Sequence, residues 1–166
     1  RTQNLINIEG KGKMEDSLFS VKDKIIIVTG GLGQLGAQYV KTLHERGAKV
    51  AALATHVDAA RVDRVLGAIK ASDRLLCAEV NITDKASINQ VLDKIEAKWG
   101  VPDGLVNNAG VDTQPSAPPE VSGPFEDFPE AVFREVVEVN LVGTFLMPQQ
   151  VGQRMRLAGK GGASIN

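Results

Sequence analysis

The sequence predicts an α/β fold in which a parallel sheet is doubly wound, with helices covering both of its faces. Short apolar runs alternate along the chain with segments whose apolar residues recur at helical spacing, the pattern of strand–helix–strand units. A glycine-rich turn directly follows the first apolar run. The 166 residues suffice for one domain around a single core.

The first expected strand covers residues 24–28, a continuous β-branched run that suits a strand buried on both faces. A helix should follow the glycine-rich turn and end before Gly47. One face of this helix should pack against the sheet. The side chains expected on that face are those of Leu35, Tyr39, Val40 and Leu43.

The alternation continues with strands at residues 49–54 and 74–80 and with a fourth strand that begins at Leu105. The two helices between these strands are amphipathic, and Thr83 or a neighbour should cap the second one. Right-handed crossovers would place the strands in the order 3-2-1-4. The apolar positions of the two helices are Val62, Val65, Leu66 and Ile69, then Ile88, Val91, Leu92, Ile95 and Trp99.

The last third of the chain begins with residues 112–124, which are rich in Pro and Ser and should form a surface loop. Residues 129–158 have helical character, with possible interruptions at Gly143 and Pro148 and a kink expected at Pro148. Residues 163–166 should start a fifth strand. Residues 1–20 show no periodicity and are expected to form a flexible leader or a tag-like segment. The chain therefore divides into this leader and one α/β domain, residues 21–166.

Composition argues against several kinds of function. Lys+Arg (19) and Asp+Glu (20) nearly cancel, so nucleic acid or an anionic membrane is not expected as the main partner. No apolar run approaches the roughly 20 residues that span a bilayer. Cys77 is the only cysteine and is expected to be a small core residue in a buried strand. Neither His44 nor His56 has a cysteine or a second histidine nearby, so no metal site is expected. A reducing, cytoplasmic setting fits best.

The glycine-rich turn covers residues 29–36 and lies between an expected strand and an expected helix. Gly30 would allow the tight turn, Gly33 the close approach of the backbone to a pyrophosphate, and Gly36 close packing of helix on strand. The N-terminus of the helix would present free N–H groups to the anion. The turn predicts a Rossmann-like dinucleotide site; the alternative is a glycine-rich turn without a ligand.

Four further segments carry a resemblance to a known family. Residues 107–110 read Asn-Asn-Ala-Gly, residues 81–84 Asn-Ile-Thr-Asp, residues 139–145 Val-Asn-Leu-Val-Gly-Thr-Phe, and residues 162–166 Gly-Ala-Ser-Ile-Asn. With the glycine-rich turn, the chain from about Leu18 onward resembles the short-chain dehydrogenase/reductase family. That resemblance implies a Rossmann-like domain and NAD(P)-dependent hydride transfer between an alcohol and a ketone.

The resemblance also implies a set of site residues. Asn140 matches the family's active-site asparagine, and no metal ligand is implied. The positions that match the cofactor site are Gly30, Gly33, Gln34, Leu35, Gly36, Ala54, Thr55, Asn81, Ile82, Asn108, Ala109 and Gly110.

The chain departs from the family pattern at several positions. Its glycine spacing is that of the extended branch, whereas the ordinary branch has glycine or alanine where Gln34 stands. The Asn-Asn-Ala-Gly segment belongs to the ordinary branch, and Asn140 agrees with it. Asn81 replaces the aspartate that usually contacts adenine, although its amide can still hydrogen-bond to a base edge.

The choice between NAD and NADP stays open. Ala54 stands where NAD-preferring relatives have the carboxylate that binds the ribose 2′-hydroxyl, which removes the repulsion of a 2′-phosphate. The Arg or Lys that usually binds the 2′-phosphate is also absent from the turn after the second strand and from the glycine-rich turn. Thr55, His56 and Arg61 are candidate contacts to a phosphate, and Asp58 is a candidate ribose carboxylate if the strand ends later.

The family's catalytic Tyr-x-x-x-Lys element, whose tyrosine transfers the substrate proton, is absent from these residues. The only tyrosine, Tyr39, is followed four residues later by Leu43 and is expected to be a core or half-buried residue. Ser164 precedes the position of the family serine and is assigned to strand packing. Only Asn140 remains of the catalytic set, so we expect the 166-residue chain to be catalytically incompetent.

A sheet that ends at the fourth strand would expose an edge, and in the family the helix after Asn140 packs against a partner subunit. A homo-oligomer or a swapped dimer is therefore expected. Three functions remain open at this point. The chain is the dinucleotide-binding part of an NAD(P)-dependent oxidoreductase, a stand-alone dinucleotide-binding module, or an oligomeric interaction module that binds no nucleotide.

Overall fold

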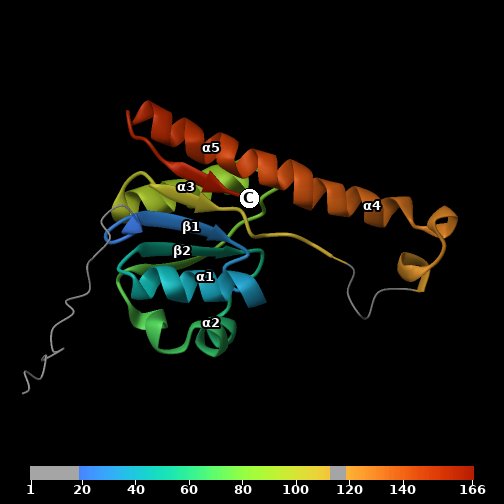
Figure 1. Ribbon diagram of the computed structural model, residues 1–166, viewed down its shortest axis with the longest axis horizontal. Coiled ribbons are helices and arrows are strands. Elements are labelled where there is room, and N and C mark those ends of the chain that lie inside the picture. Colours follow the sequence, from blue (N-terminus) through green and yellow to red (C-terminus); the bar gives the residue numbers. More distant parts are fainter. Residues whose placement is uncertain (1–18, 113–118) are drawn as a thin grey trace, which may run out of the picture.

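The computed structural model describes residues 19–112 and 119–166. Its centre is a five-stranded, wholly parallel sheet in the order β3-β2-β1-β4-β5 (Figure 1). The doubly wound α/β class and the strand order 3-2-1-4 are thereby confirmed. Nearly all of the expected leader and residues 113–118 of the expected loop lie outside the described residues.

The strands are β1 (Ile25–Thr29), β2 (Lys49–Ala54), β3 (Leu75–Glu79), β4 (Gly104–Val106) and β5 (Ala163–Ile165). Ile26 of β1 pairs with Val50 on one side and with Gly104 on the other, so β1 lies inside the sheet. All five of its residues are buried, as expected for a continuous apolar run in a parallel sheet. The expectation that the fourth strand forms an edge is wrong, because β5 pairs with β4 and the edges are β3 and β5.

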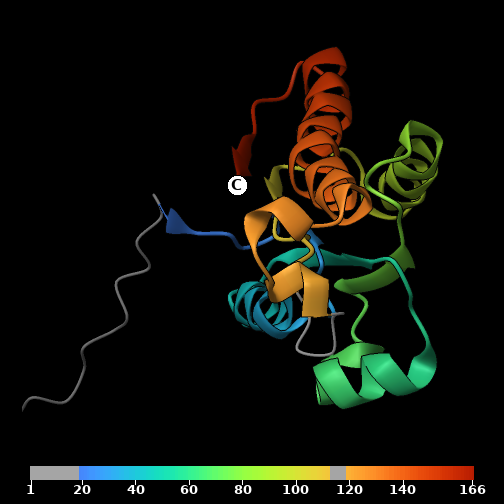
Figure 2. The ribbon, with the colours of Figure 1, turned by 90° about the vertical axis from the view of Figure 1, so that its right-hand side faces the viewer.

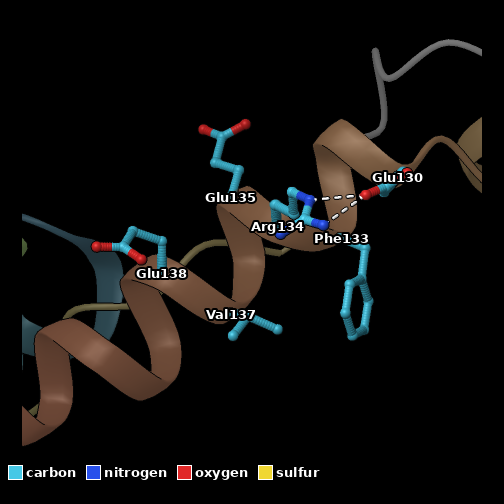
Figure 3. Close-up of a pocket in the computed structure, with 6 residues that line it drawn as sticks. All are labelled: Glu130, Phe133, Arg134, Glu135, Val137 and Glu138. Atoms are coloured by element: carbon cyan, nitrogen blue, oxygen red, sulfur yellow. Dashed lines mark hydrogen bonds and ion pairs between the residues drawn. The ribbon is translucent and has the colours of Figure 1, made fainter.

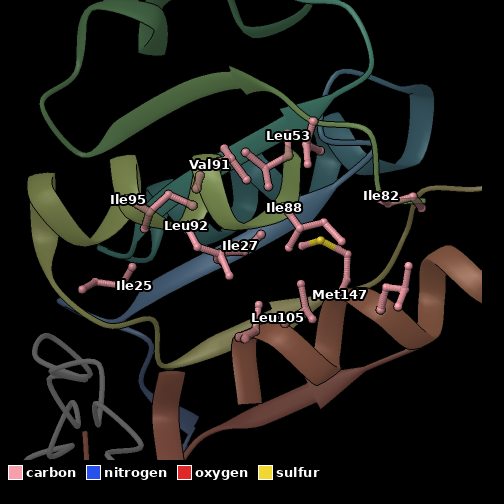
Figure 4. Packing of buried hydrophobic residues seen from close by; sticks show 14 of the residues in the cluster. Ile25, Ile27, Leu53, Ile82, Ile88, Val91, Leu92, Ile95, Leu105 and Met147 are labelled. Carbon is pink, nitrogen blue, oxygen red and sulfur yellow. The ribbon is translucent and has the colours of Figure 1, made fainter. Parts of the chain in front are cut away.

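Helices cover both faces of the sheet (Figure 2). Alternate residues of β1 point to opposite faces, so Ile25 and Ile27 pack in the core under α3 and α5, and Ile26 and Val28 in the core under α1 and α2. Figure 4 shows the first of these cores, in which Met147 of α5 meets residues of α3 and the sheet. The helices are α1 (Gln34–Glu45), α2 (Ala59–Leu66), α3 (Lys85–Trp99) and α5 (Thr144–Leu157).

Aspartate side chains begin two of these helices. Asp58 caps α2 by accepting the N–H of Arg61 at 2.7 Å, and Asp84 caps α3 by accepting the N–H of Ala86 at 2.8 Å. The cap of α3 is thus the neighbour of Thr83. Short 3₁₀ helices complete the connections: η2 (Gly67–Ala71), η3 (Pro119–Ser122) and η4 (Phe125–Asp127).

The C-terminal third forms one long helical rod, in which α4 (Glu130–Val137), η5 (Glu138–Gly143) and α5 follow one another without a break (Figure 1). Of the two expected interruptions, Gly143 coincides with the end of the irregular segment, which is η5, a π-helical stretch. Helix α5 continues through Pro148. Gly143 ends η5 where the rod meets the β3–α3 turn, and a Cβ there would lie 2.7 Å from Ile82 Cδ1.

Two side-chain expectations for α1 are wrong. Leu35 and Tyr39, expected to face the sheet, are 64% and 43% exposed, respectively. The buried residues of α1 are Gly36, Ala37, Val40 and His44, because small residues in its first turn bring the helix axis close to the sheet. Val40 and the partly buried Leu43 pack as expected.

Cys77 lies on the edge strand β3 and is half-buried against the core under α1 and α2, where burial raises the pKa of its thiol. Across residues 19–112 and 119–166, no helix has the length and apolarity needed to cross a membrane. The same residues contain no group of His, Cys, Asp and Glu side chains that could hold a metal ion.

Candidate functional site

A cleft of about 830 Å³ lies at the carboxyl ends of β1, β2 and β4. Strand order reverses between β1 and β4, and open α/β sheets bind ligands in the crevice at such a switch point. Eleven of the twelve residues predicted from the sequence to contact the cofactor line this cleft. They are Gly30, Gly33, Gln34, Leu35, Ala54, Thr55, Asn81, Ile82, Asn108, Ala109 and Gly110.

Gly36 is the predicted residue that does not line the cleft. A Cβ at this position would lie 2.1 Å from the carbonyl oxygen of Gly30, so α1 packs directly on the preceding turn. Gly30 itself has φ +64°, a conformation that favours glycine. The two glycines shape the turn, while Gly33 and Gln34 face the cleft.

A hydrogen-bonded lock, which was not expected from the sequence, joins the glycine-rich turn to the Asn-Asn-Ala-Gly segment. The Thr29 hydroxyl, on a residue only 1% exposed, accepts the N–H groups of Asn108 and Ala109, each at 3.0 Å. In return, Asn108 Nδ2 donates to the carbonyls of Thr29 at 3.0 Å and Gly30 at 3.3 Å. The threonine before the first glycine was the only sequence signal for this lock.

The first turn of α1 offers unpaired backbone donors to the cleft. Gly33 is its N-cap residue and supplies no side-chain cap, and the first turn contains no acidic residue. The initial N–H groups of a helix have no intrahelical partner and lie at the positive end of its dipole. This end of α1 is therefore suited to an anionic group such as a pyrophosphate.

Asn81 borders the cleft where β3 leads into α3. Its Oδ1 accepts the N–H of Thr83 at 3.0 Å and the hydroxyl of Thr83 at 2.8 Å, which closes an Asx turn. Its Nδ2 has no partner among the described residues and is the group that can donate to a ligand. The neighbouring Ile82 is buried and supplies an apolar wall.

Asn140 lies within the π-helical segment η5 and is hydrogen-bonded to the loop that follows β4. Its Oδ1 accepts the N–H of Val111 at 2.8 Å, and its Nδ2 donates to the carbonyl of Val111 at 2.9 Å. Val111 lines the cleft next to Gly110. Both ends of the Asn140 amide are thus occupied by backbone, which positions the wall of the cleft.

The β2 side of the cleft carries Thr55 and Arg61. Arg61 extends back from α2 and donates from Nη1 to the carbonyl of His56 at 3.0 Å and from Nη2 to that of Leu32 at 3.4 Å. Neither His56 nor Asp58, the other open candidates, lines the cleft. The N–H of Arg61 lowers the pKa of the Asp58 carboxyl, with a smaller contribution from His56.

Tyr39 and Ser164 lie away from the cleft. Tyr39 lines a hollow between α1 and β5, together with Ile165 and Asn166. Ser164 is exposed on β5, and its Oγ accepts a hydrogen bond from Asn107 Nδ2 at 3.3 Å. Neither hydroxyl is placed to act on a ligand in the cleft.

A separate hollow of about 610 Å³ runs along α4 and contains none of the predicted residues. Figure 3 shows it as an open helix surface, on which Glu135 and Phe133 point away from each other. Arg134 and Glu130 form an ion pair there, but both side chains are 75% exposed. Solvated pairs of this kind stabilise a helix slightly and do not indicate a site.

Comparison with known proteins assigns this architecture. The family model for short chain dehydrogenase matches residues 24–166. The chain belongs to the short-chain dehydrogenase/reductase family, which confirms the resemblance seen in the sequence. The chain is 34% identical over 151 residues to an NAD-dependent glycerol dehydrogenase from Listeria innocua, a match that covers 91% of this chain and 54% of that protein.

Other members of the short-chain dehydrogenase/reductase family give matches of the same kind. An NADP-dependent (R)-specific alcohol dehydrogenase from Lentilactobacillus kefiri is 30% identical, with 88% of this chain and 54% of that protein covered. The crystal structure of a short chain dehydrogenase from Leptospira borgpetersenii with bound NAD+ superposes with a TM-score of 0.69 at 30% identity, over 87% of this chain and 51% of that chain. The chain thus spans about half the length of the relatives it matches.

Proposed function

We propose that this chain supplies the dinucleotide-binding part of an NAD(P)-dependent oxidoreductase that interconverts alcohols and ketones. The cleft carries this proposal, because it lies at the switch point of the sheet and is lined by eleven of the predicted cofactor residues. When bound, the nicotinamide would supply or accept the hydride.

Each wall of the cleft is suited to one part of a dinucleotide. The uncapped N-terminus of α1, with Gly33 and Gln34, suits the pyrophosphate. The free Nδ2 of Asn81 and the apolar side chain of Ile82 suit the adenine. We assign the segment from Asn108 to Gly110, which the Thr29 lock fixes against the glycine-rich turn, to the nicotinamide half.

Asn140 is the family's active-site asparagine by sequence, and we propose that in this chain it acts as a positioning residue, because its amide is bonded on both sides to Val111. The 166 residues contain no Tyr-x-x-x-Lys element, and Tyr39 lies outside the cleft. We therefore propose that these residues alone bind a dinucleotide without turning over an alcohol. Measurable alcohol dehydrogenase turnover by this chain would contradict that view.

We also propose a homo-oligomer in a cytoplasmic setting. Leu141, Phe145 and Leu157 on the helical rod are each at least 60% exposed, which supports packing against a second copy. The single cysteine agrees with a reducing compartment. Light scattering at micromolar concentration should give a multiple of the chain mass, and a monomer mass would overturn the oligomer.

Calorimetric titration with NADH and NADPH tests dinucleotide binding. A matched pair of variants shows whether the cleft is the site: Gln34→Glu places a carboxylate at the N-terminus of α1, and Gln38→Glu places the same charge one turn later, outside the cleft. Repulsion of the pyrophosphate should weaken binding to Gln34→Glu about tenfold or more. A carboxylate in the first turn of a helix does not destabilise it, so any loss of affinity is separable from folding.

The expected result is micromolar or tighter binding to the unmodified chain, a weakened Gln34→Glu and an unchanged Gln38→Glu. Absence of heat with both dinucleotides would overturn the proposed function and leave an interaction module that binds no nucleotide. Equal binding to the two variants would place the ligand elsewhere.

A further inference from the structure

The β2 side of the cleft carries residues that bear on the choice between NAD and NADP, an inference that rests on the proposed function. The two cofactors differ only at the adenosine ribose, where NADP has a 2′-phosphate and NAD a hydroxyl. Relatives of this chain include an NAD-dependent and an NADP-dependent enzyme, so resemblance does not decide. The residues of this chain must decide it.

No carboxylate of the described residues lines this side of the cleft. β2 ends at Ala54, and the next residue is Thr55, whose exposed hydroxyl has no partner among the described residues. The charged residues that line the cleft are Arg61, Asp112 and Glu135. Asp112 follows β4 and Glu135 lies on α4, so Arg61 is the charged residue that accompanies Ala54 and Thr55.

Arg61 is held in place by backbone groups. Its guanidinium donates to the carbonyl of Leu32 in the glycine-rich turn and to that of His56 in the β2–α2 turn, so it joins the two turns that border this side. A guanidinium has five N–H donors in a fixed plane, and these bonds use two of them. The remaining N–H donors and the positive charge of the guanidinium stay available to a phosphate, a group that Arg binds well.

The two nearby carboxylates are engaged elsewhere. Asp58 caps α2, and its Oδ2 lies 3.5 Å from His56 Nε2. Glu79 accepts the N–H of Val57 at 2.9 Å and lies 3.3 Å from His56 Nδ1. Neither lines the cleft, so neither is placed to accept a ribose 2′-hydroxyl there.

We propose that Arg61 and the Thr55 hydroxyl bind the 2′-phosphate of NADP, so that this chain prefers NADP(H) to NAD(H). Arg61 would supply charge-assisted hydrogen bonds, and Thr55 would donate a further hydrogen bond from the end of β2. The absence of a carboxylate at Ala54 leaves nothing at that position to repel the phosphate.

The test is the ratio of the NAD+ and NADP+ dissociation constants, measured by calorimetry at pH 8, where the 2′-phosphate is fully ionised. The chain should bind NADP+ at least about tenfold more tightly, since a hydrogen bond to a charged group contributes about one to two orders of magnitude. Arg61→Ala should reduce the ratio to below about threefold, and Arg61→Lys should retain part of it. Thr55→Asp should reverse it by repelling the phosphate.

Arg64→Ala is the matched control, because it removes one positive charge from the exposed side of the same helix, outside the cleft. Arg61→Ala also loosens the glycine-rich turn and the β2–α2 turn and so lowers the affinity for both cofactors. The ratio of the two dissociation constants is measured because this shared loss cancels in it. An unchanged ratio in Arg61→Ala, or NAD+ bound as tightly as NADP+ by the unmodified chain, would overturn this inference and leave the proposed function intact. Binding of neither cofactor would overturn both.

Discussion

Replacing Gly36 by alanine should destabilise this domain, although a glycine-to-alanine change inside a helix ordinarily stabilises a protein. A Cβ at position 36 would lie 2.1 Å from the Gly30 carbonyl oxygen and 2.7 Å from Asn108 Nδ2. Neither atom can move alone. Gly30 follows directly on β1, and Asn108 Nδ2 donates to the carbonyls of Thr29 and Gly30. Either α1 or the glycine-rich turn must therefore shift by about an ångström, the size of the overlap that has to be relieved.

Two opposing effects set the magnitude. An alanine in place of a helical glycine gains about 0.8–1 kcal/mol in helix propensity. Overpacking of a close contact costs about 1–3 kcal/mol, and a contact with backbone belongs at the upper end. The net expectation for Gly36→Ala is a loss of about 2 kcal/mol in the free energy of unfolding.

Gly152→Ala in α5 is the matched control. Gly152 is also helical and exposed, and a Cβ there would meet no atom within 4 Å. Only the propensity gain applies, so the two variants should differ by about 3 kcal/mol. Urea unfolding followed by circular dichroism measures both. A Gly36→Ala variant as stable as Gly152→Ala would show that α1 does not pack against the Gly30 carbonyl as tightly as described.

Three further predictions concern hydrogen bonds and titration. Thr29→Val keeps the shape of the side chain but leaves two backbone N–H groups without their acceptor, so the free energy of unfolding in urea should fall by about 2 kcal/mol. Thr29→Ser keeps the hydroxyl, and an equal loss in that variant would contradict the role of the lock. Asn140→Ala removes both hydrogen bonds to Val111 and should lower the free energy of unfolding by about 1–2 kcal/mol, because Asn140 is exposed. It should also weaken dinucleotide binding, and unchanged binding would argue against a positioning role. Burial, then the charge of Arg74, lower the pKa of His44 below 6.5, so the unfolded chain binds the proton more readily and stability should fall as the pH drops below 6.5. In His44→Gln this loss between pH 6.5 and 5 should be smaller, and an unchanged slope would show that other groups cause it.

The sheet and the cleft were predictable because their signals are local and repeated. The buried run at β1 and the glycines after it share one physical cause, a parallel strand that leads into an anion-binding helix terminus. Position along the chain then placed Asn81 and Asn108 at the same edge of the sheet. Eleven of the twelve predicted residues meet in one cleft for this reason.

Features that depend on packing between distant segments were not predictable. Leu35 and Tyr39 fit an apolar helix face, yet Gly36 and Ala37 face the sheet, because close approach of α1 to the Gly30 turn selects small residues. The π-helical type of η5 was not predicted, although Gly143, which ends it against Ile82, was expected to interrupt the helix. Arg61 was a candidate phosphate contact by sequence, but its hydrogen bonds to the carbonyls of His56 and Leu32 leave no trace there.

The most direct test of dinucleotide binding in the cleft is a ¹H–¹⁵N correlation spectrum of the chain recorded while NADPH is added. Backbone amides at the glycine-rich turn and the first turn of α1, residues 30–36, and those of residues 108–111 should shift together along one saturating curve. The amides of α5, none of whose residues lines the cleft, should stay in place. Shifts confined to the helical rod, or a spectrum unchanged at millimolar NADPH, would contradict the assignment of this cleft.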